Sequence, residues 1–141
     1  ETEERFAHMT DDEFSTFMQA SVLAGMAIAY TGTSIPHGLS YTLTYENGVP
    51  HGKAVGVFLS GFLKKYGDST ETEYVVKQLL GFDDIDAFRD YIRTLFGNLD
   101  MSEELWKKDR DGILANPAKL KNYPFELTAD VLDDYVRYYN A

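Results

Sequence analysis

Residues 35–52 read IPHGLSYTLTYENGVPHG, and they contain the tripeptide Pro-His-Gly twice. The copies are Pro36-His37-Gly38 and Pro50-His51-Gly52, so two of the chain's three histidines stand in identical local settings. Proline is favoured in the first turn of a helix, where its missing N–H does little harm, so each copy predicts a helix start. Asn47-Gly48 between them is a strong stop signal. The stretch therefore predicts a short helix, a turn and a second helix.

The sequence on both sides predicts more helices and no strand. Upstream, Thr10-Asp11-Asp12-Glu13 is a capping box, and apolar residues then recur at helical spacing as far as Ala29. Residues 20–29 are small and apolar all round, which predicts a helix packed by neighbours on several sides. Downstream, further helices are predicted after Pro50 and after the caps Ser69 or Thr70, Asp83 or Asp84, Ser102 and Thr128, with a short turn opened by Asn116-Pro117. The predicted fold class is all-α, a bundle-like domain of about seven helices.

Length and charge narrow the classes of function. A chain of 141 residues fits a single domain over residues 1–141. A net charge of −10 argues against a nucleic-acid partner, because phosphate binding needs clustered Lys and Arg. The apolar run 20–30 is about half as long as a membrane helix requires. Because the chain also has no cysteine and no visible signal peptide, we expect a cytoplasmic protein without a membrane partner.

The histidine pair has two interpretations. In the first, each ring caps or packs locally at its own helix start. In the second, His37 and His51 bind one metal ion, since the positive end of a helix keeps an imidazole neutral and its lone pair available. The chain has to fold back for this, and residues 45–50 are long enough to allow it. Gly38 and Gly52 would let another element or a ligand approach closely.

We favour the metal interpretation, although a catalytic zinc-type site usually has three protein ligands. His8 lies in a poorly patterned segment, and the many Asp and Glu residues after position 68 read as helix caps and solvated faces. The sequence therefore predicts a metal site of which this chain supplies His37 and His51.

Several segments carry a resemblance to a known family. Residues 18–27 read MQASVLAGMA, residues 37–52 place His37 and His51 fourteen positions apart, and the tail contains MSEE at 101–104, Asn116-Pro117 and LTADVL at 127–132. Together they resemble the C-terminal helical domain of the iron-containing (group III) alcohol dehydrogenases, with its M-x-A-S-L-L-A-G-x-A helix and its H-x-x-x-H…P-H-G region. The resemblance covers about residues 14–139. It implies a dehydroquinate synthase-like all-α fold.

The resemblance also implies a chemistry. In that family one Asp and three His hold Fe²⁺ or sometimes Zn²⁺, and hydride passes from an alcohol to NAD or NADP. His37 and His51 resemble the last two ligands, whereas the Asp and the first His lie upstream of the equivalent of Phe14. The N-terminal dinucleotide-binding domain, which binds most of the NAD(P), is expected to be absent from this chain. Many members have a further His near the nicotinamide where this chain has Tyr41, whose hydroxyl could still form a hydrogen bond there; no catalytic residue is assigned.

The leading hypothesis is therefore the C-terminal part of a metal-dependent alcohol dehydrogenase, inactive as an isolated chain. Its expected partners are a small alcohol or aldehyde and further copies of itself in a homo-oligomer. The start Glu1-Thr2-Glu3-Glu4, without Met, is compatible with processing, a trimmed chain or a fragment. The alternative is a free-standing helical interaction module with a vestigial histidine pair. A related polyol or glycerol dehydrogenase ranks lower, because the spacing of the two histidines suits the iron group better.

Overall fold

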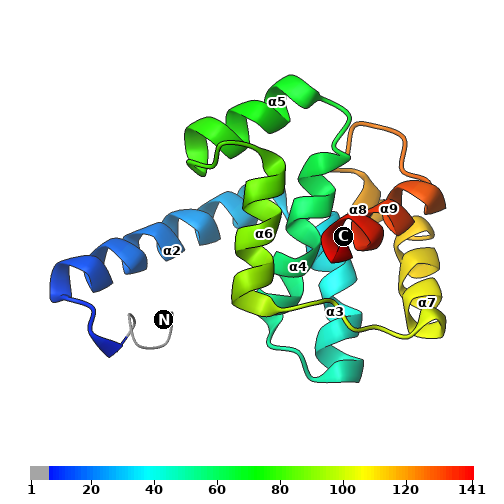
Figure 1. Ribbon diagram of the computed structural model, residues 1–141, viewed down its shortest axis with the longest axis horizontal. Helices are drawn as coiled ribbons and strands as arrows, with labels where there is room; N and C mark the ends of the chain where they lie inside the picture. The colour runs from blue at the N-terminus through cyan, green and yellow to red at the C-terminus, as the bar shows by residue number, and fades with distance from the viewer. Residues whose placement is uncertain (1–6) are drawn as a thin grey trace. The chain divides into compact units, whose positions relative to one another are not determined.

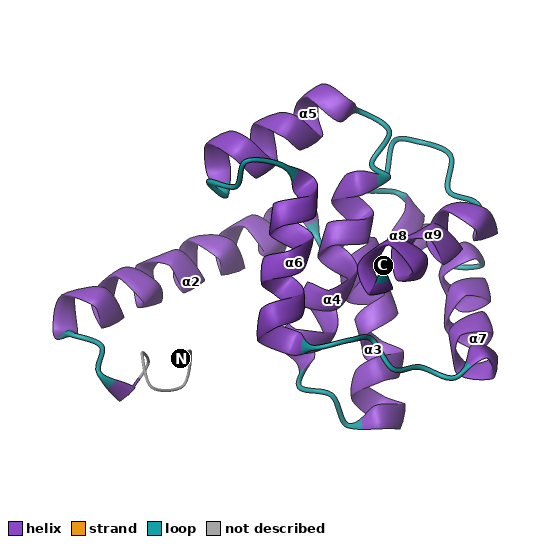
Figure 2. Ribbon diagram, in the orientation of Figure 1, coloured by secondary structure: helices purple, strands orange, loops and turns teal. Residues whose placement is uncertain are grey.

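A computed structural model describes residues 7–141 of the chain, and every regular element in that range is helical (Figure 1 and Figure 2). The predicted all-α fold class is confirmed. The contacts within the chain divide it into two units, one that ends at Thr33 and one that comprises Ser34–Ala141. Each unit is described by itself.

The N-terminal unit contains one long helix, α2 (Asp11–Thr31). The predicted capping box is present: the Thr10 hydroxyl accepts the Glu13 N–H at 3.3 Å, and the Glu13 carboxylate accepts the Thr10 N–H at 2.9 Å. Each bond satisfies a backbone donor that a helix start leaves without an intrahelical partner. The helix ends where Gly32 takes a positive φ of 73°.

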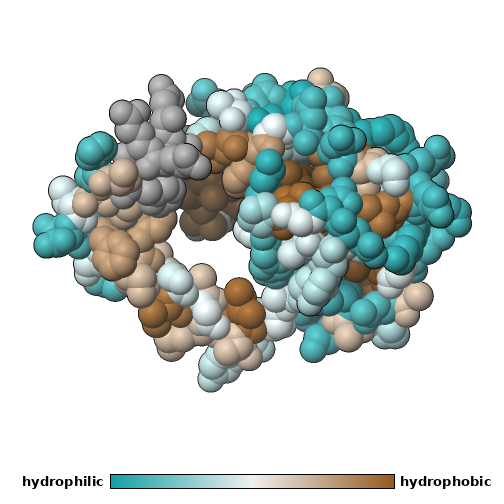
Figure 3. Space-filling model, turned by 90° about the horizontal axis from the view of Figure 1, so that it is seen from below, coloured by the Kyte–Doolittle hydropathy of each residue, from teal (hydrophilic) through white to brown (hydrophobic). Residues whose placement is uncertain are grey.

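The side chains of α2 are exposed, which contradicts the prediction that residues 20–29 are buried. Leu23 is 65 % exposed and Met26 is 59 % exposed. Tan and brown surface, the colours of apolar residues, follows this helix in the space-filling view (Figure 3). The prediction failed because an apolar composition favours burial but does not supply the neighbouring helices that burial needs.

The second unit opens with the helix–turn–helix that the repeated tripeptide predicts. Helix α3 (Ile35–Asn47) is followed by Gly48, which adopts the left-handed conformation at φ 65° and donates its N–H to the Leu43 carbonyl. Helix α4 (His51–Lys64) begins directly after Pro50. Helix α3 thus continues as far as the Asn47-Gly48 stop, and the chain turns back within three residues.

The rest of the second unit is a series of short helices: α5 (Ser69–Glu73), the π-helix η1 (Tyr74–Leu79), α6 (Ile85–Phe96), α7 (Glu103–Leu114), α8 (Pro117–Leu120) and α9 (Ala129–Asn140). The predicted caps Ser102 and Thr128 are confirmed, and Asp84 is the cap of α6. The cap of α5 is Asp68 rather than Ser69 or Thr70. An Asp carboxylate is a strong N-cap acceptor, and here it receives two backbone N–H groups.

Helix α4 lies at the centre of the second unit and packs against α3, α6 and α9 (Figure 1). Its buried face includes Val57 and Phe58. Gly61 allows the close approach of α9, since a Cβ atom there would lie 2.6 Å from the Cα atom of Tyr135. The core also contains buried side chains of α3, α6, α7 and α9, among them Leu39 and Leu132. Within residues 7–141, no helix has both the length and the apolar character to cross a lipid bilayer.

Candidate metal centre

His37 lies in the first turn of α3. Ser34 is the N-cap residue in an extended conformation, and Pro36 occupies the first turn ahead of the histidine. The ring is half-buried. Burial lowers the pKa of His37, and the charges of His51 and Lys119 lower it further. The neutral imidazole is therefore favoured, and only the neutral ring has a lone pair for a metal ion.

His51 is the first residue of α4, and its side chain is exposed. Pro50 precedes it as the N-cap, with φ −52° and ψ 134°. Both histidines thus occupy helix starts, as the repeated Pro-His-Gly predicts. The fold-back that a shared site requires is also present.

The two imidazole rings are neighbours. Their centroids are 5.4 Å apart and their planes are inclined by 64°, although the residues are fourteen positions apart in the chain. The Tyr41 ring stacks on His51 with a centroid separation of 5.9 Å and planes only 6° from parallel. One turn of α3 and the start of α4 therefore bring three rings together.

Ser40 connects the two histidines through its hydroxyl. Its Oγ donates to the backbone carbonyl of His37 at 2.7 Å and lies 3.4 Å from Nδ1 of His51. Because the hydroxyl hydrogen is already directed at the carbonyl, the oxygen faces Nδ1 as an acceptor. This arrangement favours the His51 tautomer with hydrogen on Nδ1, which leaves the Nε2 lone pair free for a ligand.

The residues suit part of a metal site. Two adjacent imidazole rings, one of them with a pKa lowered by burial, are donors of the kind that Fe²⁺ or Zn²⁺ takes. Among the described residues, no group of three or more His, Cys, Asp or Glu side chains is placed to hold an ion. The remaining histidine, His8, belongs to the other unit.

The two glycines of the repeated tripeptide differ in their surroundings. A Cβ atom at Gly38 would collide with Cδ1 of Ile113 and would lie 3.6 Å from Cγ and Cδ of Lys119. Gly38 therefore permits the close approach that the sequence predicts. A Cβ atom at Gly52 would have no described neighbour within 4 Å, so no described element approaches there, and the approach of a ligand stays a prediction.

Lys119 is a residue beside the pair that the sequence does not reveal. It lies in α8, and its Nζ is 5.0 Å from the centroid of the Tyr41 ring. The lysine follows the Asn116-Pro117 signal by only two positions, but that signal predicts a turn and not its place in the fold. Ser40 was also missed, although a serine three positions after His37 is well placed to bond its carbonyl.

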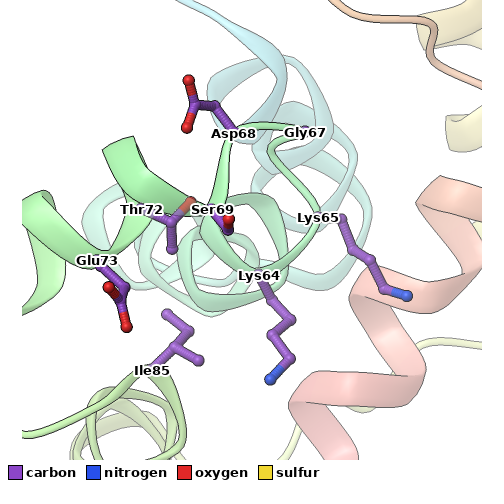
Figure 4. A pocket seen from close by; sticks show the side chains of 8 residues that line it. All are labelled: Lys64, Lys65, Gly67, Asp68, Ser69, Thr72, Glu73 and Ile85. Atoms are coloured by element: carbon purple, nitrogen blue, oxygen red, sulfur yellow. The ribbon is translucent and has the colours of Figure 1, made fainter.

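A separate hollow near the end of α4 is a weaker candidate site (Figure 4). It is lined by Lys64, Lys65, Gly67, Asp68, Ser69, Thr72, Glu73 and Ile85. Lys65 extends toward α9, where its Nζ lies 2.6 Å from an Asp134 carboxylate oxygen (Figure 4). Lys64 has its Nζ 4.0 Å from Asp86 and 5.2 Å from the centroid of the Tyr138 ring. Both ammonium groups thus already have charged or aromatic partners.

Comparison with known proteins identifies the family of the chain. A model of the Fe-containing alcohol dehydrogenase family, C-terminal, matches residues 4–111, which is most of the chain. The chain belongs to this family, and the resemblance inferred from its motifs is confirmed. Membership makes the parent protein an oxidoreductase. The comparisons with curated proteins and with solved structures give no match.

Proposed function

We propose that this chain is the metal-binding helical part of an enzyme that transfers hydride between a small alcohol or aldehyde and NAD or NADP. The observation that carries the proposal is the adjacency of the His37 and His51 rings in a chain of the Fe-containing alcohol dehydrogenase family. The three-residue turn between α3 and α4 reverses the chain, and the two rings lie side by side.

Each residue at the pair has a separate task in this proposal. His37 and His51 would hold the ion, Fe²⁺ or Zn²⁺, through ring nitrogens. Ser40, 3.4 Å from Nδ1 of His51, would favour the tautomer with hydrogen on Nδ1 and help to orient the ring. Tyr41, stacked on His51, would lie near the nicotinamide and present its hydroxyl there. When bound, the ion supplies Lewis-acid polarisation of the substrate oxygen.

The remaining parts of the enzyme would come from outside these 141 residues. We propose that two further metal ligands and the main dinucleotide-binding surface are supplied by other sequence, so that the isolated chain is inactive. The homo-oligomer and the cytoplasmic location remain predictions. The family match does not favour the alternative, a helical interaction module with a vestigial histidine pair. A polyol or glycerol dehydrogenase would have the same type of chemistry, and the spacing of the two histidines suits the iron group better.

A zinc titration followed by NMR of the histidine ring protons tests the proposal. His37 and His51 should respond together to one equivalent of Zn²⁺, and His8 is the internal control in the same spectrum. A response of neither ring in the pair would contradict the metal site and favour the interaction module. Alcohol oxidation by the chain with NAD⁺ or NADP⁺ and Fe²⁺ should be undetectable. Robust turnover would contradict the claim that other parts are required.

A further inference from the structure

A second pocket of the C-terminal unit lies where the end of α4 faces α5 and η1. Its volume is ≈ 230 Å³, and it shares only Thr72 with the hollow of Figure 4. Because sites for drug-sized ligands measure about 300–1,000 Å³, this pocket suits a smaller molecule. Neither His37 nor His51 lines it. Its apolar wall comprises Phe62, Leu63, Tyr66 and Val75.

Packing holds the aromatic part of this wall in place. The rings of Phe62 and Tyr66 contact each other, with centroids 5.4 Å apart and planes inclined by 52°. The buried ring of Tyr123 contacts both of them, at centroid separations of 5.9 and 5.8 Å. The Tyr123 hydroxyl in turn donates a hydrogen bond to the Lys65 carbonyl at 3.1 Å. A wall that is fixed before binding loses little entropy when an apolar group enters the pocket.

Glu71 is the one charged residue among the eight that line the pocket. Its side chain is exposed. Within residues 7–141 its backbone N–H is bonded to Asp68, whereas its carboxylate takes part in no ion pair or hydrogen bond. The hydroxyl of Thr72, by contrast, already donates to the Leu63 carbonyl at 2.9 Å. The charged group available to a ligand in this pocket is therefore an anion.

The surroundings of the pocket are acidic as well. Burial raises the pKa of Tyr66, and the negative charges of Glu71 and Asp68 raise it further, so both carboxylates act on the aromatic wall. The neighbouring Lys64 and Lys65 each pair with a carboxylate on another helix. The whole chain has a net charge of −10, which attracts a cation from a distance and repels an anion.

We propose that this pocket binds a small organic cation, an alkylammonium compound whose apolar body lies against Phe62 and Tyr66 and whose ammonium group faces Glu71. Removal of the apolar body from water supplies most of the affinity. An ion pair with an exposed carboxylate adds a preference of up to about fivefold over an uncharged compound of the same shape. The inference does not rest on the proposed function, because the pocket contains neither histidine of the pair.

The test uses three compounds with the same branched apolar body: 3-methylbutylammonium is a cation, 3-methylbutan-1-ol is uncharged and 3-methylbutanoate is an anion. Each is titrated into the full chain at constant pH and ionic strength, without added metal, while NMR follows the ring signals of Phe62 and Tyr66. Glu71→Gln removes the charge. Glu73→Gln is the matched control, because Glu73 lies on the same helix, pairs with Lys77 and does not line this pocket. Its loss changes the net charge equally.

The wild-type chain should bind the ammonium compound with a Kd in the millimolar range, about threefold more tightly than the alcohol, and should bind the carboxylate most weakly. Glu71→Gln should abolish the preference for the ammonium compound over the alcohol, whereas Glu73→Gln should retain it. The alcohol should bind Glu71→Gln as tightly as it binds the wild type, which shows that the pocket is intact in the variant.

Four results overturn the inference. They are equal affinities of the three compounds for the wild type, a preference that survives Glu71→Gln, a preference that Glu73→Gln abolishes equally, and no response of the Phe62 and Tyr66 rings to any compound. The ring signals of His37 and His51 are recorded in the same spectra. If the ammonium compound perturbs these two rings and not those of Phe62 and Tyr66, it binds at the histidine pair and the assigned pocket is wrong.

Discussion

The imidazole rings of His37 and His51 lie 5.4 Å apart between centroids, although each belongs to a different helix and the residues are fourteen positions apart. Two local signals bring this about. The Asn47-Gly48 stop ends α3, and Pro50 starts α4 three residues later. The turn reverses the chain so that the second ring lies beside the first turns of α3, where it contacts Ser40 and Tyr41.

Removal of either ring should weaken metal binding strongly. His37→Ala and His51→Ala should each reduce zinc affinity by at least about tenfold, because each removes one direct ligand and second-shell losses alone reach that size. The double variant should lose little more, since one remaining nitrogen is not a site. Isothermal titration calorimetry measures the affinities, and His8→Ala should leave them unchanged. Equal affinity in His8→Ala and His37→Ala would contradict a site at the pair.

Asp109 gives the stability of the fold a pH dependence of its own. This residue of α7 is 7 % exposed, accepts a 2.7 Å hydrogen bond from Thr42, and has no hydrogen-bond partner for Oδ2 among the described residues. Burial raises the pKa of Asp109 from its usual 3.8 to about 6, while the Thr42 hydrogen bond and the Lys108 charge act in the opposite direction. The folded state therefore prefers the protonated carboxyl.

The sign of the effect follows from the raised pKa. Below pH 4 the carboxyl is protonated in both the folded and unfolded states. Above pH 6 it is ionised in both, and the buried charge then lowers the stability of the folded state. Asp109→Asn should thus increase the free energy of unfolding at pH 7 by up to about 3 kcal/mol relative to the wild type, and by little near pH 4. Denaturant unfolding at both pH values measures the difference.

Asp111→Asn is the control for that experiment. Asp111 lies on the same helix, and hydrogen bonds from Lys107 and Arg110 lower its pKa. Loss of this carboxylate should give no gain in stability at pH 7. If Asp109→Asn shows the same small gain at pH 4 and pH 7, the buried carboxylate is not the cause of the pH dependence.

The two glycines of the repeated tripeptide should respond oppositely to alanine. Gly38→Ala places a methyl group against Ile113 and should destabilise the fold by about 1–3 kcal/mol, the usual range for an overpacked position. Gly52→Ala adds a methyl group in open space within α4 and should stabilise by about 0.5–1 kcal/mol through helix propensity. Thermal and denaturant unfolding distinguish the two. Equal effects would contradict the packing of α8 and Ile113 against α3.

The cap of α5 can be tested in the same way. Asp68→Ala removes the acceptor of the Thr70 and Glu71 N–H groups, at 2.9 and 3.1 Å, and should cost about 1 kcal/mol of stability. Ser69→Ala, at a position that the sequence also suggests as the cap, should change stability by less than about 0.5 kcal/mol. A larger loss of stability in Ser69→Ala than in Asp68→Ala would contradict Asp68 as the cap and place the helix start one residue later.

The local signals of the sequence predicted much of the fold and the two helix starts that carry the histidine pair. Capping residues such as Thr10 and Thr128 act on their own helices, so their effect is visible without knowledge of the rest of the chain. The histidine pair was predicted for the same reason, because two strong helix starts and one stop lie within eighteen residues. These features depend on neighbours in sequence.

The parts that could not be predicted depend on neighbours in space. Lys119 reaches Tyr41 across seventy-eight positions, and Thr42 reaches Asp109 across sixty-seven, and no local pattern specifies either contact. The exposure of α2 was mispredicted because its small apolar residues indicate that the helix is suited to burial. They do not indicate that other elements cover it. Asp109 reads in sequence as one more acidic residue on a solvated helix.

The most direct test of a shared metal site is an anomalous-scattering map from crystals of the zinc-loaded chain. The proposal predicts one zinc peak within about 2.1 Å of a ring nitrogen of both His37 and His51, the usual Zn–N distance. Nε2 is the predicted donor of His51, because Ser40 occupies Nδ1. A zinc peak at only one of the two rings, or none between them at saturating zinc, would contradict the central claim.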